Sequence, residues 1–355
     1  MMEKKVAIIM INYKHYAKRF LHDSFASLEK LNYPKDKYRV YVVDNVTSPE
    51  TIEICQQLAP GASIVPSSGN GWGLANNLGV KQAIKDGFDD YFFFVNMDTE
   101  FDAEFVTEAV RAYESDNRIG IVQSKLLLHT PVDGKYMLNS KGNNLTFLGF
   151  GYCAGDGKTD DVKAEISDIT YASGAALLVS KKVWQETGEF DESYFMYHDD
   201  VEINFKVKLA GYRTVLAPRS VVYHKHEFGR SIVQINFMER NRLRFLLEFY
   251  KWQTLLLIMP AWIIMEIGMF PYAIINKWVL IKLKVYGWFL NPKNIWLLAR
   301  KRKAVQSLRK VSDKELLKGV VAVVDFQQIN NPVLKYIANP IFDFYWSVCK
   351  SLINW

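Results

Sequence analysis

Cysteine is scarce in this sequence of 355 residues. The three cysteines, Cys55, Cys153 and Cys349, lie far apart and form no CxxC pair. Their spacing argues against a disulfide framework and against a zinc site, and it predicts a reducing compartment. A signal peptide is also missing, because the apolar run 6–11 is too short for one and predicts a first strand instead. We therefore expect the protein to start in the cytosol.

Glycine motifs for phosphate binding are absent as well. The loop 67–73 is rich in serine and glycine, but its spacing matches neither a Walker A loop nor a GxGxxG fingerprint. Disorder is excluded, because 49% of the residues are hydrophobic and 23% are charged, which is normal for a packed globular protein. The length is compatible with one large domain or two smaller ones.

Acidic residues are missing from one long segment. Residues 277–310 hold ten Lys or Arg and no Asp or Glu, and they are mixed with aromatic residues that include Trp278, Trp288, Phe289 and Trp296. The net charge of +6 is the sum of −5 over residues 1–235 (26 basic, 31 acidic) and +11 over residues 236–355 (18 basic, 7 acidic). The basic segment predicts a surface for an anionic partner.

Short apolar runs alternate with helical patterns in the first 125 residues. Strands are predicted at 6–12, 38–43, 62–66, 91–95 and 119–124, and helices at 16–31, after Ser48, at 74–86 and at 102–115. This alternation is typical of a parallel sheet. Residues 125–168 lose the periodicity and predict an excursion over the sheet that contains a hairpin. A strand at 169–179, a helix at 181–187 and a helix ending near 210 are predicted to follow.

The run 91–95 is the most apolar of these strands, and it ends in oxygen ligands. Asn96 and Asp98 follow it directly. Ligands of open α/β sheets bind outside the carboxyl ends of the strands, so both side chains are predicted at a substrate site. Oxygen ligands at i and i+2 suit Mg²⁺ or Mn²⁺ that also binds phosphates. The alternative is an ordinary strand followed by an Asp-rich turn.

A second acidic group opens the helix that ends near residue 210. It contains Asp199, Asp200 and Glu202. Acidic side chains in a first turn interact favourably with the helix dipole, so helix capping is the first interpretation of these three residues taken alone.

Several elements occur together in one order. They are Ile11-Asn12-Tyr13, Val43-Asp44-Asn45, the loop 69–77, Asn96-x-Asp98, Gly174, the run 190–202 and Ala210-Gly211-Tyr212. Over roughly residues 4–245 this ordered set resembles the family-2 inverting glycosyltransferases, and among them the rhamnosyltransferase-like members. The resemblance implies an α/β catalytic domain of the GT-A type at 1–245, with a Rossmann-like mixed sheet flanked by helices.

The resemblance also assigns roles to residues on the donor side. Asp44 is expected to contact the nucleotide base, and Asn12 and Tyr13 to line the same pocket. Five further residues are expected to bind substrate: Asn70, Gly71, Trp72, Asn96 and Gly174. Asn96 stands where the family's metal motif has its first acid.

Metal binding and catalysis are assigned in the same way. Asp98 is expected to bind Mg²⁺ or Mn²⁺, and His224 to be a further ligand, with His226 as the alternative. Asp200 is expected to be the general base beside Asp199. Inverting transfer needs a base for the acceptor hydroxyl and a cation for the diphosphate. Neighbouring carboxylates are expected to raise the pKa of Asp200.

The implied substrates are a dTDP-sugar or UDP-sugar and a polyprenyl-linked saccharide, in cell-surface polysaccharide assembly. Donors such as dTDP-rhamnose, a UDP-hexose and UDP-galactofuranose all fit the residue set. A sugar nucleotidyltransferase is an alternative enzyme, but it would need a basic Gly-rich loop where this chain has Asn-Tyr-Lys-His-Tyr at 12–16. Nucleic-acid binding by the basic segment is a further alternative. The neighbouring apolar segment favours lipid, so we expect no nucleic-acid partner.

Residues 246–355 are predicted to form a helical, basic region that associates with the membrane. The segment 253–275 is apolar except for Glu266, and Pro260 and Pro271 interrupt it. Its length suits a membrane span, but a central Glu is unfavourable there. We expect helices that lie in the cytosolic leaflet against anionic lipid, on the cytoplasmic face of the cell membrane. A true span and a soluble helical cap are the alternatives. Residues 320–324 and the aromatic end 342–346 are predicted as further helix.

Overall fold

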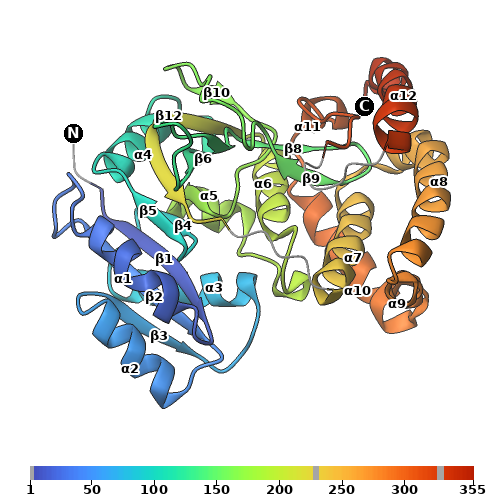
Figure 1. The fold of residues 1–355 in the computed structure, drawn as a ribbon. Helices are drawn as coiled ribbons and strands as arrows, with labels where there is room; N and C mark the ends of the chain where they lie inside the picture. Colours follow the sequence, from blue (N-terminus) through green and yellow to red (C-terminus); the bar gives the residue numbers. More distant parts are fainter. Residues whose placement is uncertain (1–3, 227–231, 326–331) are drawn as a thin grey trace.

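A mixed sheet occupies the N-terminal two thirds of the protein (Figure 1). The computed structural model describes residues 4–226, 232–325 and 332–355. Within these residues the sheet has ten strands, in the order β10-β12-β6-β11-β4-β1-β2-β3, with β5 paired to β12 and β7 to β6. The strands are β1 Val6–Tyr13, β2 Tyr38–Asn45, β3 Ser63–Ser67, β4 Tyr91–Val95, β5 Thr99–Phe101, β6 Ile119–Leu128, β7 Leu138–Ser140, β10 Ser167–Asp168, β11 Ala176–Ser180 and β12 Arg213–His224. A separate hairpin joins β8 Asn143–Leu145 and β9 Gly151–Cys153.

Helices flank the sheet and then form the rest of the chain. Those of the sheet region are α1 Ala17–Leu28, α2 Pro49–Leu58, α3 Trp72–Lys85, α4 Phe105–Glu114, α5 Lys181–Thr187 and α6 Asp199–Leu209, with a short 3₁₀ turn η1 at Glu192–Tyr194. The C-terminal ones are α7 Ile232–Phe249, α8 Trp252–Ile275, α9 Val279–Leu290, α10 Pro292–Ser307, α11 Asp313–Leu316, η2 Leu334–Ala338 and α12 Asn339–Leu352. They lie on the side of the molecule away from β1–β3 (Figure 1).

The sheet has the mixed topology that the sequence predicts. Strand β1 pairs in parallel with β2 and β4, and β2 with β3. Strand β11 runs antiparallel between β4 and β6. The carboxyl ends of β1, β2 and β4 therefore meet at one edge, which is where ligands bind in open α/β sheets.

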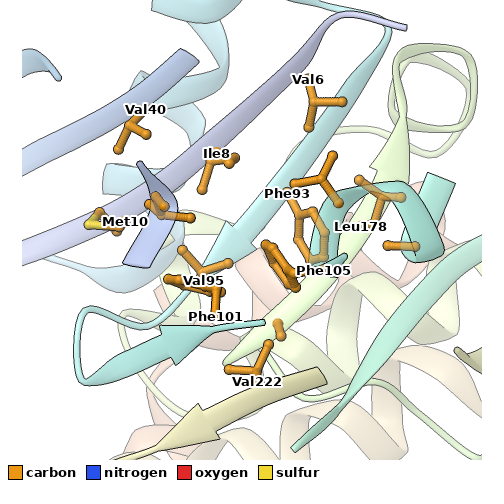
Figure 2. Close-up of a cluster of buried hydrophobic side chains, with 14 of the residues drawn as sticks. Val6, Ile8, Met10, Val40, Phe93, Val95, Phe101, Phe105, Leu178 and Val222 are labelled. Atoms are coloured by element: carbon orange, nitrogen blue, oxygen red, sulfur yellow. The ribbon is translucent and has the colours of Figure 1, made fainter. Parts of the chain in front are cut away.

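The core beneath this edge is apolar on both faces of the sheet. Alternate residues of β1 (Val6, Ile8 and Met10) point to the face covered by α1 and α4 (Figure 2). On the same face Phe93 of β4 stacks on Phe105, with ring centroids 4.2 Å apart. Strands buried on both faces become near-continuous apolar runs, which is why β4 was recognisable from sequence.

The predicted strand 169–179 is wrong in its first half, because only Ala176–Ser180 forms β11. Side chains take the backbone donors that a strand would need there. The N–H of Ala172 donates to Asn204 Oδ1 (3.0 Å), and that of Ser173 donates to Gln123 Oε1 (2.7 Å). The segment 169–175 consequently leaves the ladder and passes the carboxyl edge of the sheet.

Most of the described C-terminal third is helical as predicted, but residues 320–324 are not. The N–H of Val321 donates to Leu145 O (3.0 Å), and the N–H of Phe147 donates to Val321 O (2.9 Å). This segment is thus extended against the residues that follow β8, and the helix predicted for it is wrong. Of the aromatic end, Phe342 and Trp346 are buried, whereas Phe344 is exposed.

Helix α7 connects the two parts of the chain. The predicted division between residues 245 and 246 falls inside this helix, and it stays a prediction. Helix α8 runs through Pro260 and Pro271 without a break. It has 24 residues, and an 18-residue window within it has a mean hydropathy of 1.7, so it is long and apolar enough to cross a membrane by length and composition alone.

Glu266 of α8 is accommodated by an inward-facing ion cluster. Its carboxylate lies 2.6 Å from Arg242 Nη2 of α7 and 2.6 Å from Lys282 Nζ of α9. Both cations also pair with Glu239 of α7. We call Glu239, Arg242, Glu266 and Lys282 the α7–α9 ion cluster. Two acids and two bases balance each other, so the central Glu is compatible with an apolar helix.

The opposite side of these helices is apolar and exposed. We call the following residues of α8, α9 and α12 the apolar outer face: Trp252, Leu256, Met259, Ile263, Ile264, Ile267, Ile274, Ile275, Leu280, Leu283, Leu290, Ile341, Phe344, Val348 and Leu352. Many exposed apolar side chains on neighbouring helices favour an interaction with a membrane or a protein.

Candidate active site

Buried polar side chains join the ends of β1 and β2. Asn12 lies opposite Asp44 in the parallel register, and its amide donates a 2.8 Å hydrogen bond to Asp44 Oδ1. The second carboxylate oxygen of Asp44 accepts from the hydroxyl of Thr51. Tyr13, the last residue of β1, is exposed. The strand ends are therefore held in a fixed geometry, with the Tyr13 ring accessible beside them.

The loop before α3 lies close to β2. The side chain of Asn70 is 3.2 Å from the amide of Asn45, the last residue of β2. Gly71 has a φ of 145°, in the region that favours glycine, and α3 begins directly after it. The N–H of Trp72 donates to Phe195 O (2.8 Å), which ties this loop to the segment before α6.

Asp98 is held by two residues from other elements. The hydroxyl of Tyr16 donates to Asp98 Oδ2 at 2.8 Å. Nε2 of His224, the last residue of β12, lies 3.3 Å from Asp98 Oδ1. Burial raises the pKa of Asp98, but its contacts with His224 and Tyr16 outweigh burial, and the pKa lies below its ordinary value. Asp98 is thus an ionised, buried carboxylate.

The tautomer of His224 follows from its other neighbours. The amide nitrogen of Asn139 donates to Asp156 Oδ1 (3.1 Å), so Asn139 Oδ1 faces His224 Nδ1 at 2.8 Å. An amide oxygen only accepts, and Nδ1 must therefore carry the proton. Nε2, the other ring nitrogen, faces a carboxylate oxygen of Asp98. Within the described part of the chain, this buried Nε2 makes no hydrogen bond.

An imidazole nitrogen and a carboxylate oxygen that face each other in a buried site can hold a cation between them. Imidazole nitrogen and carboxylate oxygen are both ligands for Mn²⁺, and carboxylate is preferred by Mg²⁺. Among residues 4–226, 232–325 and 332–355, no group of three or more His, Cys, Asp or Glu could hold a metal ion by itself. Asp98 and His224 therefore fit a cation whose remaining ligands come from phosphate and water. His226 lies beside His224, with ring centroids 5.1 Å apart.

Five of the predicted site residues line one cavity of about 400 Å³. They are Trp72, Asn96, Gly174, Asp199 and Asp200. Residues of η1–α6 and α7 complete the wall, including Tyr197, His198, Gln234 and Met238. The ring of Trp72 packs against Gly174, where an added Cβ would lie 2.8 Å from Trp72 Cζ2. Gly174 is therefore required for this close approach.

Asp200 has the environment of a general base. Its Oδ2 accepts from the N–H of Gly174 (3.4 Å), and its Oδ1 accepts from the N–H of Val201 (2.9 Å). Burial raises the pKa of Asp200 to about 6, and the backbone donors oppose that rise. Burial, and not the neighbouring carboxylates, is the main cause, contrary to the expectation from sequence. A base with a pKa near the working pH is suited to proton abstraction.

Asp199 is the first residue of helix α6 and not its N-cap. The N-cap is His198, and it makes no side-chain capping bond. Burial and the charges of Asp200 and Glu202 raise the pKa of Asp199 well above its ordinary value. Among the residues described, Oδ1 of Asp199 is buried without a hydrogen-bond partner. Asp199 lies in the first turn of α6, as the capping interpretation expects, and its side chain lies close to Gly73 of α3.

The segment before α6 has a strained backbone. Phe195, Tyr197 and His198 all have φ between 63° and 71°. Such conformations are unfavourable for non-glycine residues and persist only when neighbouring contacts hold them. Asn241 of α7 supplies such contacts, because its side-chain amide donates to the carbonyls of Tyr194 (3.0 Å), Met196 (2.9 Å) and Tyr197 (2.8 Å).

Three more side chains secure this segment. Arg240 Nη2 donates to the carbonyls of Ser193 (3.1 Å) and Tyr194 (2.8 Å), and Arg244 Nη1 donates to Ser193 O (3.0 Å). Nε2 of His198 contacts Gly149 O at 2.9 Å. Helix α7 thus fixes the segment that presents Asp199 and Asp200 to the cavity.

Sequence reasoning missed Tyr16, Asn139 and Asn241. Tyr16 is 82 residues from Asp98 in the chain, Asn139 is 85 residues from His224, and Asn241 is 44 residues from Tyr197. No local pattern marks them, because each acts through one contact with a distant segment. Tyr16 alone had a weak signal, since it follows the Asn12-Tyr13 strand end.

Comparison with known proteins agrees with this geometry. Residues 91–297, more than half of the chain, match the family described as glycosyl transferase family group 2, and residues 6–164 match glycosyl transferase family 2. The chain therefore belongs to the family-2 glycosyltransferases. It is a sugar-transferring enzyme of glycan biosynthesis, and the family predicted from its motifs is confirmed.

Two relatives are rhamnosyltransferases. Rhamnosyltransferase WbbL of Escherichia coli K12 is 27% identical over 238 residues, which cover 64% of this chain and 86% of that protein. The N-acetylglucosaminyl-diphospho-decaprenol L-rhamnosyltransferase of Mycobacterium tuberculosis H37Rv is 25% identical over 211 residues, 54% of this chain and 68% of that protein. The chain is thus rhamnosyltransferase-like.

A solved structure confirms the fold. The crystal structure of GalNAc-T7 with UDP, GalNAc and Mn²⁺ superposes with a TM-score of 0.58 at 13% identity. The match covers 81% of this chain and 56% of that chain, so this chain spans little more than half the length of that protein. At this identity the likeness concerns the fold alone, and it agrees with the GT-A type that the sequence predicts.

Proposed function

We propose that this enzyme transfers a sugar, with inversion, from a nucleoside-diphosphate sugar to a hydroxyl of a lipid-linked saccharide. The observation that carries the proposal is the position of Asp200. Its carboxylate is fixed by the N–H groups of Gly174 and Val201 and lines a cavity together with Trp72 and Asn96. The acceptor hydroxyl enters this cavity and gives its proton to Asp200. Asp199, beside it, is a buried carboxyl that shapes the same wall.

The donor occupies the carboxyl edge of the sheet. Asn12, Tyr13 and Asp44 form the nucleotide side, and Asn70 and Gly71 lie next to it on the loop before α3. Tyr13, the exposed aromatic residue there, is suited to stack on the base. The donor is a dTDP-sugar or a UDP-sugar. Asn96 follows β4 and lines the cavity of Asp200, as expected for a residue that contacts the transferred sugar.

Asp98 and His224 are proposed to hold Mg²⁺ or Mn²⁺. A cation bound there supplies positive charge to the diphosphate leaving group. The fit rests on the position of His224 Nε2, which is buried and lies 3.3 Å from Asp98 Oδ1. Tyr16 orients Asp98 by donating a hydrogen bond to its other carboxylate oxygen, Oδ2. Asn139 orients His224 by accepting a hydrogen bond from its other ring nitrogen, Nδ1. His224 contacts both Asp98 and Asn139, and so it is preferred over His226 as the metal ligand.

The acceptor and the location are proposed together. One relative is named for a decaprenol-linked acceptor, and the apolar outer face and the basic residues of α10 suit an anionic membrane surface. We place the enzyme on the cytoplasmic face of the cell membrane, in the assembly of a cell-surface polysaccharide. Its helices α8 and α9 lie in the leaflet, because one side of α8 is packed on the protein through Glu266.

Substitution of Asp200 tests the proposed base. Asp200→Asn should lower sugar transfer by about 10²–10⁴-fold, the range for loss of a general base. Binding of UDP or dTDP with Mn²⁺, measured by calorimetry, should remain. Asp199→Asn is the matched neighbour and should lower transfer much less. If Asp200→Asn were active and Asp199→Asn inert, Asp199 would be the base.

The pH dependence gives a second readout of the same group. Transfer requires ionised Asp200, whose pKa is raised to about 6. The rate should therefore level off above about pH 7, be about half-maximal near pH 6 and fall about tenfold per pH unit well below it. A profile that stays flat down to pH 5 would contradict the assignment of this carboxylate as the base.

A further inference from the structure

A second cavity lies between helices α7, α8 and α9. It has a volume of about 440 Å³ and an almost wholly hydrocarbon lining. Leu243 and Leu246 of α7 form its buried end, and Ile258 and Trp262 of α8 and Phe289 of α9 form its sides. A cavity with this lining excludes a sugar or a nucleotide, and it suits a hydrocarbon chain.

The cavity opens on the apolar outer face. Trp252, Leu256, Met259 and Leu290 line it, and all four also belong to that exposed face. A hydrocarbon chain therefore passes from a lipid environment into the cavity without crossing polar surface. The hydrocarbon chain would therefore enter the cavity without the free-energy cost of burying a polar group.

Cations lie at the rim and along the route to the active site. The guanidinium of Arg302 stacks on the Trp252 ring at 4.2 Å. Arg240 of α7 stacks on Trp288 of α9, at 5.7 Å. A hydrocarbon pocket with guanidinium groups beside it is complementary to a lipid that carries phosphates. Both guanidinium groups are also anchored to the protein, because Arg302 donates to the carbonyls of Leu247 and Tyr250 and Arg240 to those of Ser193 and Tyr194.

Helix α7 gives the distance between the two cavities. Met238 lines the cavity of Asp200, and Leu243 and Leu247 line the apolar one. At the helical rise per residue these positions are roughly 8 to 14 Å apart along the axis. This is the order of length of a diphosphate and one sugar ring. Arg240 lies between the two cavities in sequence.

We propose that the cavity between α7, α8 and α9 binds the first isoprene units of a prenyl-diphosphate-linked acceptor. Arg302 and Arg240 face its phosphates, and the saccharide reaches the cavity of Asp200. The inference rests on the proposed function and adds to it a separate binding site for the lipid of the acceptor. Recognition then involves the acceptor's hydrocarbon as well as its sugar.

Farnesyl diphosphate, a soluble prenyl diphosphate, is the probe, and it is titrated into the full-length protein by calorimetry. Met259→Trp fills the cavity from its mouth and should weaken binding at least tenfold. Ile263→Trp adds the same ring at an exposed position of the same helix that does not line the cavity, and should leave binding unchanged. Leu256→Trp, at a more exposed lining position, repeats the test if Met259→Trp proves unstable.

The charge at the rim is tested separately. Arg302→Gln should weaken binding of farnesyl diphosphate and leave that of farnesol unchanged, whereas Lys303→Gln on the same helix should affect neither. Equal binding by Met259→Trp, Leu256→Trp and the unsubstituted protein would overturn the proposal. Displacement of the probe by dodecylphosphocholine at equal concentration would also overturn it, because the cavity would then accept ordinary lipid.

Nucleotide binding on the same preparations separates this proposal from the proposed function. If UDP and dTDP bind with Mn²⁺ but farnesyl diphosphate does not, the lipid site is refuted and sugar transfer stands. If neither nucleotide binds, the proposed function is refuted, and with it the lipid site that rests on it.

Discussion

The sheet region and the C-terminal helices bury opposite kinds of residue. Beneath the sheet, side chains such as Phe93 and Ile8 are fully buried, and the polar site residues stand at strand ends. In the helical region Arg242 and Lys282 are fully buried, and apolar residues such as Ile267 and Phe344 are exposed. The first arrangement, with apolar side chains inside, is the one expected for a protein region surrounded by water. The second arrangement favours an apolar neighbour outside the helices, since exposed apolar surface of this extent is unfavourable in water.

Replacement of a phenylalanine by alanine should destabilise the protein in the sheet region and leave its stability nearly unchanged in the helical region. Phe93→Ala removes a ring stacked on Phe105 and should lower the free energy of unfolding by about 3–5 kcal/mol. Phe344→Ala removes an exposed ring of α12 and should change it by less than about 0.5 kcal/mol. Thermal unfolding measures the first effect, and co-flotation with vesicles should show weaker membrane binding for Phe344→Ala alone. An equal loss of stability in Phe93→Ala and Phe344→Ala would contradict this difference between the two regions.

Glu266→Gln tests whether the buried charges of the helical region depend on one another. It removes one of two negative charges and leaves Arg242 and Lys282 with Glu239 alone. Loss of one partner from a buried ion group should lower stability by about 3 kcal/mol. Glu315→Gln, at an exposed position of α11, is the control and should have little effect. An unchanged melting temperature for Glu266→Gln would contradict the ion cluster.

Asn139→Ala tests whether Asn139 orients His224 for metal binding at the edge of the sheet. His224 would lose the acceptor that fixes its tautomer, and Mn²⁺ affinity should fall about 10–100-fold. Asn144→Ala on β8 is the control. Manganese binding can be followed by electron paramagnetic resonance without any turnover. Unchanged Mn²⁺ affinity would show that Nδ1 of His224 needs no partner.

The smallest effect is expected from exposed lysines of the helical region. Lys284, Lys293 and Lys303 are exposed, and each near an anionic surface should contribute about 1 kcal/mol to binding. Their replacement by Gln should weaken binding to anionic vesicles and leave binding to neutral vesicles unchanged. Raised salt should have the same effect. Lys301 pairs with Asp191 at 2.8 Å and is unsuitable for this test, because its loss disturbs the fold.

Residues that act near their own strand end were predictable from sequence. Asn96 and Asp98 follow an apolar strand, and Asp200 follows an ordered motif, so a local pattern sufficed for each. Tyr16 and Asn139 were not predictable, because their function depends on side chains more than 80 residues away. These contacts exist only once the sheet has formed.

Errors in secondary structure had the same origin. The segment 169–175 has the composition of a strand, but Gln123 and Asn204 take its backbone donors. Residues 320–324 pair with the chain after β8 and therefore do not form a helix. The position of Glu266 inside the protein needed the partners on α7 and α9. In each case a distant side chain or backbone overrides the local preference.

The hydrogen bonds between α7 and the segment 193–198 limit where this enzyme can be joined to a relative to make a hybrid. Asn241 and Arg244 supply hydrogen bonds to that segment from a helix that continues to Phe249. A graft of foreign C-terminal helices joined at residue 245 would cut this helix before Glu248, which accepts a 2.9 Å hydrogen bond from the Tyr194 hydroxyl, and would leave the segment on a frayed end. A junction after Tyr250 would carry the whole helix with the sheet region. Exchange of acceptor specificity between relatives should therefore succeed at the later junction and fail at the earlier one.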